Sequence, residues 1–142
     1  MKHISRVICG IVLLTVPTIE FGGYFLLNVI SGNEEGLALT SFQEAMFRAG
    51  HAHAGVLVIL ALVAIILSNY ANLNDKLLWI VRIGFPLSSI LISGGFFAAA
   101  TGNQLTQPNE LILILYIGIV ILTISLILLG VGLLKKLPSN KI

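Results

Sequence analysis

The residues best suited to chemistry are two histidines in the segment Arg48-Ala49-Gly50-His51-Ala52-His53-Ala54-Gly55. Neutral imidazole is a common ligand of iron and other metals, and its second nitrogen usually has a hydrogen-bond partner. The small residues around both histidines leave room for a neighbouring helix or for a flat macrocycle close to the backbone. We therefore predict that His51 or His53 binds a metal or a metal-containing cofactor. The alternative for each is a structural hydrogen bond.

The two histidines are expected to point to different sides of one helix. Residues two apart in an α-helix are rotated by about 200°, so His51 and His53 should not bind one ion as a pair. His51 shares its face with Glu44, Arg48 and Gly55, and Glu44 can pair with Arg48 at i, i+4. The face of His53 continues through small and apolar residues. One histidine would then face its own bundle and the other a neighbouring helix or subunit.

The composition places this helix in a membrane. Of the 142 residues, 57% are hydrophobic and 10% are charged, and the mean hydropathy is +1.03. Soluble domains carry about 25% charged residues. A spanning helix needs about 20 mostly apolar residues, and four segments qualify: 7–27, 49–68, 77–100 and 111–134. The predicted fold is an all-α integral membrane four-helix bundle, with residues 1–142 forming a single transmembrane domain.

The charges predict the orientation of the bundle. Basic residues cluster at both termini and around the second connection: Lys2, Arg6, Lys76, Arg82, Lys135, Lys136 and Lys141. The first and third connections carry acidic residues: Glu34, Glu35, Glu44 and Glu110. The positive-inside rule then puts both termini in the cytoplasm of a cell-membrane protein. Arg82 is close enough to its helix end to snorkel to the surface. The net charge of +2 follows from this topology and does not indicate nucleic acid.

Counting residues places an acid inside the membrane. The first span has only thirteen uncharged residues before Glu20, so it reaches the required length only if Glu20 enters the bilayer. Tyr24, Tyr116, Phe96 and Phe97 belong to the same outer layer as the histidines. Ionisable residues in a bilayer usually face the bundle interior or a polar cavity. We therefore expect Glu20, Tyr24 and Tyr116 to serve catalysis or proton relay beside the histidines, with the two phenylalanines as a pocket wall or an interfacial belt.

The chain resembles known membrane proteins in these residues. The motif Arg-Ala-Gly-His-Ala-His-Ala-Gly is similar to that of a group of small bacterial four-helix membrane proteins. More remotely, the chain resembles the styrene oxide isomerase and hydroxylaminobenzene mutase group in length, helix count, the histidine that follows Arg48-Ala49, and the triplet Gly95-Phe96-Phe97. This resemblance implies a trimer that holds haem b through that histidine near a subunit interface, with ferric iron as a Lewis acid on an epoxide oxygen.

The resemblance leaves the choice of ligand open. Gly50 separates the Arg-Ala pair from His51, so either His51 or His53 can correspond to the ligand of that group. His51 is favoured because it follows the pair more closely and shares the polar face. In that group a tyrosine ends the triplet, whereas this chain has Phe97. With the ligand on either histidine, Arg48, Gly55, Phe96 and Phe97 would help to bind the cofactor.

Three functions remain open from the sequence. The leading hypothesis is a haem-binding, isomerase-like homo-oligomer that acts on a small apolar substrate. The second is a small transporter that moves protons or metal ions through Glu20 and the histidines. The third is a non-catalytic membrane subunit. A copper or zinc site would need ligands from several copies, because the chain has only three histidines and one cysteine.

Overall fold

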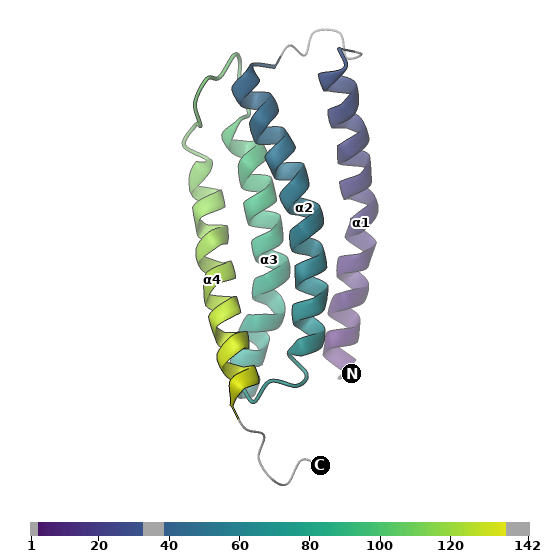
Figure 1. Cartoon of the computed structure of the whole chain (residues 1–142), viewed down its shortest axis with the longest axis vertical. Helices are drawn as coiled ribbons and strands as arrows, with labels where there is room; N and C mark the ends of the chain where they lie inside the picture. Colours follow the sequence, from purple (N-terminus) through teal and green to yellow (C-terminus); the bar gives the residue numbers. More distant parts are fainter. Residues whose placement is uncertain (1–2, 33–38, 136–142) are drawn as a thin grey trace.

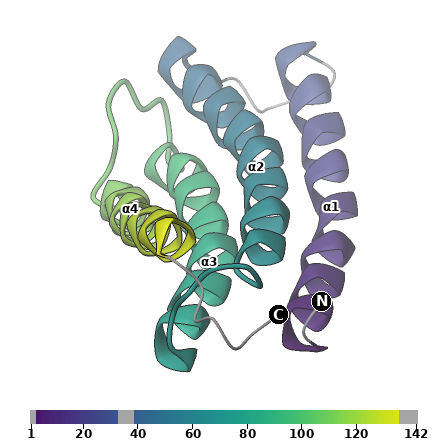
Figure 2. The ribbon, with the colours of Figure 1, turned by 60° about the horizontal axis from the view of Figure 1, so that its bottom comes forward.

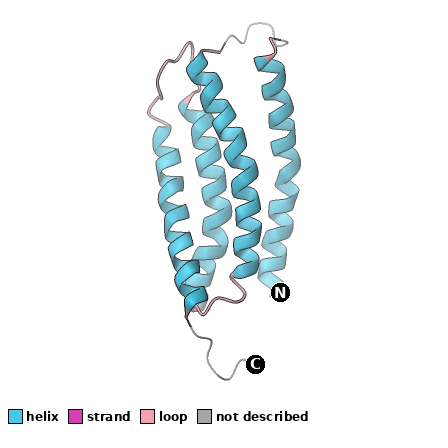
Figure 3. Cartoon of the chain, in the orientation of Figure 1, coloured by secondary structure: helices cyan, strands magenta, loops and turns pink. Residues whose placement is uncertain are grey.

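The described part of the protein is built from four helices. The computed structural model describes residues 3–32 and 39–135. These ranges contain α1 (His3–Ile30), α2 (Ser41–Leu67), α3 (Asp75–Ala99) and α4 (Ile112–Leu134), and the described residues outside the helices form loops and turns without any strand (Figure 3). The predicted all-α four-helix bundle is confirmed, and each predicted span corresponds to one helix.

Each helix is long and apolar enough to cross a bilayer. The four helices contain 28, 27, 25 and 23 residues, whereas a span needs about 20. The outward-facing side chains are largely aliphatic, as on α4 with Leu113, Ile117, Val120 and Ile127. Contiguous apolar surface of this extent suits hydrocarbon rather than water. Length, composition and surface together indicate a multi-pass membrane protein.

The central helix of the bundle is α3. Half of its apolar stretch is buried within the protein, against 17% of the corresponding stretch of α1. α4 packs mainly on α3 and α1 mainly on α2, while α1 and α4 make no contact within the described ranges (Figures 1 and 2). The first and last described residues, His3 and Lys135, lie at the same end of the bundle. The opposite end, where Thr40 and Ala100 lie, is called the far end below.

Two clusters of buried apolar side chains form the core. The larger cluster joins α2, α3 and α4 and contains Ala61, Ala64, Val81, Phe85 and Leu129. The smaller cluster joins α1 to α2 and contains Val12, Val58 and Ile65. Because α1 is attached through the smaller cluster, it is the least embedded helix.

Glycines allow α3 and α4 to approach closely. A Cβ placed on Gly95 would lie 2.6 Å from the backbone nitrogen of Leu115 and 2.7 Å from its Cα. On the facing helix, a Cβ on Gly118 would lie 2.9 Å from the backbone nitrogen of Ile92. Helix pairs in membranes use small residues in this way, because close backbone approach increases van der Waals contact. Gly95 and Gly118 therefore set the distance between α3 and α4.

α2 begins eight residues earlier than the span predicted from residue 49. Thr40 caps the helix: its side chain accepts from the Gln43 backbone N–H, and the Gln43 side chain accepts from the Thr40 backbone N–H. The buried Gln43 also donates to the carbonyls of Ala100 and Gly102, both at 2.9 Å. This capping box starts α2 before the apolar stretch. The histidines consequently lie about 15 Å along the helix instead of at its first turn.

Arg82 is buried inside the bundle, so the expectation that it snorkels to the surface is wrong. Its relative exposure is 3%, and its Nε donates to the Ser68 hydroxyl at 3.0 Å. Ser68 follows the last residue of α2 and donates in turn to the carbonyl of Ile65. The Nη2 of Arg82 has no partner among the described residues. A buried arginine therefore joins the start of α3 to the end of α2.

Candidate functional site

The histidine turn of α2 packs directly on α3 through a glycine. Gly50 is buried, and a Cβ at this position would lie 2.9 Å from Cε2 of Phe97 and 3.1 Å from Cβ of Phe96. Phe97 also packs on Phe47 of α2, with ring centroids 5.3 Å apart. Both phenylalanines of the Gly-Phe-Phe triplet thus contact the turn that carries the histidines.

His51 points from α2 toward α1. A Cβ built on Gly23 of α1 would lie 2.8 Å from Cε1 and 2.9 Å from Nε2 of the His51 ring. The tip of the imidazole therefore rests on the bare backbone of Gly23, a contact that a larger residue would obstruct. This packing turns the Nε2 of His51 toward a neighbouring helix.

His53 faces the other side of α2. Its Nδ1 lies 2.7 Å from the carbonyl oxygen of Ala49, and because a carbonyl only accepts, Nδ1 carries the proton. The ring packs on Phe96 of α3, with centroids 4.8 Å apart and planes inclined by 33°. The side chain is exposed, and its Nε2 has no hydrogen-bond partner within the described part of the chain. His53 thus presents an oriented Nε2 lone pair at the surface of the bundle.

The prediction that the two histidines point to different sides is confirmed. His51 contacts α1 at Gly23, whereas His53 contacts α3 at Phe96. Over residues 3–32 and 39–135, no group of three or more histidine, cysteine, aspartate or glutamate side chains is placed to hold a metal ion.

Replacing Gly23 by alanine is expected to displace the His51 ring. The matched control is Gly22→Ala, because a Cβ on Gly22 meets nothing within 4 Å. Both variants gain the same helix propensity. Displacing the His51 ring should make Gly23→Ala less stable than the control by about 1 kcal/mol, so the control should unfold at a higher temperature. Thermal unfolding in detergent measures this difference, and NMR of the histidine rings should show a shift for His51 in Gly23→Ala alone. Identical behaviour of the two variants would contradict the contact.

The polar face expected around His51 is partly present. Arg48 and Glu44 form the predicted i, i+4 ion pair, with Nη2 and Oε2 3.7 Å apart. The Arg48 side chain is 60% exposed and the Glu44 side chain 37%, so solvent screens this pair and it contributes little to stability. Gly55 also lies on α2, and a Cβ there would meet nothing within 4 Å. Gly55 therefore leaves open space beside the helix instead of a close helix contact.

The expected acid and tyrosines make no hydrogen bond or ion pair with either histidine within the described residues. The side chain of Glu20 is exposed on α1, and no hydrogen bond or ion pair joins it to another described residue. Tyr24 on α1 and Tyr116 on α4 are 63% and 54% exposed. Because α1 and α4 do not touch, Tyr116 lies apart from Glu20 and Tyr24. These three side chains face the surroundings of the bundle.

A cavity of about 220 Å³ lies beside the histidine turn and was not predicted as a site. It is bounded by α1, α2 and α3, and four of its lining residues carry hydroxyls: Thr15, Thr18, Ser89 and Ser93. The sequence nevertheless contains a signal for this cavity, in the spacing of two pairs of hydroxyl residues. Thr15 and Thr18 are three residues apart on one helix, and Ser89 and Ser93 are four apart on another, so each pair shares a face of an otherwise apolar helix.

The site therefore consists of an exposed, oriented His53 on one side of α2, a packed His51 on the other, and a mainly apolar cavity nearby that also contains four hydroxyls. No protein-family model, curated protein or solved structure matches the chain.

Proposed function

We propose that the protein is a membrane haem protein in which His53 binds the iron of haem b. The observation that carries this proposal is the geometry of His53. Its Nδ1–H is held by the Ala49 carbonyl at 2.7 Å, and its Nε2 is left without a partner among the described residues. Histidine ligands of metals typically have their second nitrogen fixed in this way. His53 is preferred to His51, because the Nε2 of His51 is packed against Gly23.

The residues around His53 suit a flat apolar cofactor. Four residues share its helical face by spacing, and all are small or apolar: Met46, Ala49, Val56 and Leu60. Phe96 packs on the His53 ring itself. A macrocycle bound at this exposed position would have only one side covered by the chain. The proposal therefore includes a homo-oligomer, in which a second copy covers the other side of the haem.

The proposed chemistry is isomerisation of a small apolar substrate. A ferric haem held by His53 would supply a Lewis acid, which suits an oxygen atom of such a substrate. His53 would hold the iron, and the apolar stripe would exclude water. The styrene oxide isomerase resemblance supports this reaction class, and the arrangement of His53 and Phe96 supports the binding of the cofactor.

The transporter hypothesis has less support. A proton or metal pathway needs ionisable groups that follow one another through the bundle. Glu20 is instead exposed on α1 and makes no hydrogen bond or ion pair in residues 3–32 and 39–135. The hypothesis of a non-catalytic subunit is favoured if the purified protein binds no haem.

We also propose that both ends of the chain face the cytoplasm of a cell membrane. Several basic residues lie toward the end of the bundle where the described chain starts and stops: Arg6, Lys76, Arg82 and Lys135. Glu44 and Glu110 lie toward the far end. This distribution supports the positive-inside orientation. Lys2, Glu34, Glu35, Lys136 and Lys141, which also entered the prediction, lie outside the described residues.

The test is the optical spectrum of the purified protein. The full chain is expressed with a haem precursor in the medium, purified in mild detergent, and titrated with hemin if it is colourless. We expect a Soret band, a pyridine haemochrome spectrum of b type, and iron in a fixed ratio to protein. Protein that stays colourless and iron-free after hemin titration would overturn the proposal. Zinc or copper analysis on the same sample would then identify a metal shared between copies.

A further inference from the structure

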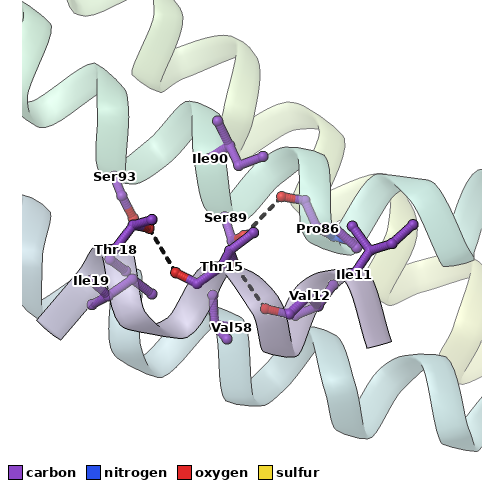
Figure 4. A pocket seen from close by; sticks show the side chains of 11 residues that line it. Ile11, Val12, Thr15, Thr18, Ile19, Val58, Pro86, Ser89, Ile90 and Ser93 are labelled. Carbon is purple, nitrogen blue, oxygen red and sulfur yellow. Dashed lines mark hydrogen bonds between the residues drawn. The ribbon is translucent and has the colours of Figure 1, made fainter. Parts of the chain in front are cut away.

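The cavity beside the histidine turn is an intramembrane space between three helices. Its volume is about 220 Å³, and its walls come from α1, α2 and α3 (Figure 4). The lining residues come from three helices: from α1, Ile11, Val12, Thr15, Thr18 and Ile19; from α2, Ala54 and Val58; and from α3, Pro86, Ser89, Ile90 and Ser93. His53 does not line it, so the cavity is separate from the proposed haem ligand.

Three of the four hydroxyls in the cavity have their hydrogen atoms engaged. Thr15 donates to the Val12 carbonyl and Thr18 to the Thr15 carbonyl, both at 2.6 Å, and Ser89 donates to the Pro86 carbonyl at 2.7 Å. These bonds stay within single helices and are drawn in Figure 4. The three hydroxyls therefore offer only acceptor lone pairs to an occupant.

Ser93 is the exception among these hydroxyls. Its relative exposure is 7%, and its Oγ is buried without a hydrogen-bond partner in the described part of the chain. Figure 4 shows its side chain extending from α3 toward Thr18 of α1. Leaving a buried hydroxyl unpaired carries a free-energy cost. Ser93 therefore offers a donor that an occupant with an acceptor oxygen would satisfy.

The cavity opens to the surroundings of the bundle between α1 and α3. These helices approach each other at few points, and the side chains of Ile11 and Ile90 on this side are exposed. An occupant would therefore enter from hydrocarbon. A dry apolar cavity of about 150 Å³ accommodates benzene, so 220 Å³ accommodates a somewhat larger molecule of about ten non-hydrogen atoms.

We propose that this cavity binds a small, membrane-partitioned molecule with a compact apolar body and one carbonyl or ether oxygen that accepts a hydrogen bond from Ser93. The size of the cavity limits the size of the apolar part of the molecule, and the unpaired Ser93 hydroxyl favours a molecule with an acceptor oxygen. A lipid acyl chain would fill the space but would leave Ser93 unpaired. Water would satisfy Ser93 but would leave the aliphatic walls in contact with a polar molecule.

The test compares two probes that differ only in the acceptor oxygen, 1-indanone and indane. The full-length protein in lipid nanodiscs is titrated with each, and saturable binding is followed by saturation-transfer NMR. We expect saturable binding of 1-indanone, weakened about tenfold by Ser93→Ala, with indane unaffected by this substitution. The matched control is Ser88→Ala, because Ser88 is also buried on α3 but donates to the Phe85 carbonyl and does not line the cavity. It should leave both probes unchanged.

A second substitution tests where the probes bind. Ala54→Leu places additional carbon atoms in the cavity wall and should abolish the binding of both probes. Ser93→Ala should keep normal thermal stability, because it removes a hydroxyl that has no hydrogen-bond partner among the described residues. Equal binding of both probes, insensitive to both substitutions, would show partition into lipid and overturn the proposal. Absence of saturable binding by either probe would also overturn it, in favour of an acyl chain or water. Neither result depends on whether the protein binds haem.

Discussion

His53→Ala is expected to remove the Soret band of the purified protein, while His51→Ala should retain it. Only His53 combines a fixed Nδ1–H with an exposed Nε2 that has no partner in the described part of the chain. Removing an outer hydrogen-bond partner of a metal ligand typically weakens binding by about 10–100-fold. Removing the ligand itself should weaken haem binding by more than this. The measurement is a hemin titration of each variant in the same detergent.

The two histidines serve as each other's control, because they belong to the same turn of α2 and are replaced by the same residue. Exogenous imidazole should restore haem binding to His53→Ala if the position vacated by the side chain is that of an iron ligand. A colourless His51→Ala beside a coloured His53→Ala would reverse the assignment. In that case α1 would have to move away from α2, because Gly23 now covers the Nε2 of His51.

Gly95→Ala is expected to destabilise the protein by roughly 2–3 kcal/mol. The new Cβ would lie 2.6 Å from the backbone nitrogen and 2.7 Å from both Cα and Cβ of Leu115. Backbone atoms cannot rotate away as the end of a side chain can, so α3 and α4 must separate. The loss of packing along this helix pair should lower the midpoint of thermal or SDS-induced unfolding, followed by circular dichroism.

The neighbouring glycine provides the control for this prediction. A Cβ on Gly94 meets nothing within 4 Å, so Gly94→Ala changes the helix propensity without a clash. Alanine is favoured over glycine inside a helix by about 0.5–1 kcal/mol, and Gly94→Ala should therefore be neutral or slightly stabilising. An equal loss of stability in both variants would contradict the conclusion that Gly95 allows the close approach of α3 and α4.

The helices could be predicted from the sequence because membrane spans depend on length and apolar content, which are local properties. The start of α2 could not be found in this way. Counting apolar residues located the hydrophobic part from residue 49, but Thr40 and Gln43 start the helix with a capping box outside that part. Gln43 also holds the loop after α3, a contact between residues 57 positions apart that no local pattern contains.

The depth of the candidate site in the membrane could be predicted from the sequence, but the directions in which its side chains point could not. Residue counting placed Glu20 and the histidines at similar levels, and the helical rotation correctly separated His51 from His53. Which histidine faces α1 depends on how α2 is rotated against its neighbours, and this follows from the packing of Gly50 on Phe96. The same uncertainty applied to Glu20, whose depth says nothing about the side of α1 on which it lies.

The buried Arg82 has a consequence for how the protein enters a membrane. Its Nε finds its acceptor in Ser68, just beyond the last turn of α2. A solitary α3 would offer this cation no such acceptor, and an arginine within hydrocarbon carries a free-energy cost that reaches about 2.5–3.5 kcal/mol at the centre of a helix. Biogenesis is therefore easier when α2 and α3 insert together as a helical hairpin. Within the described ranges the two outer helices do not touch each other, so each packs on this hairpin independently.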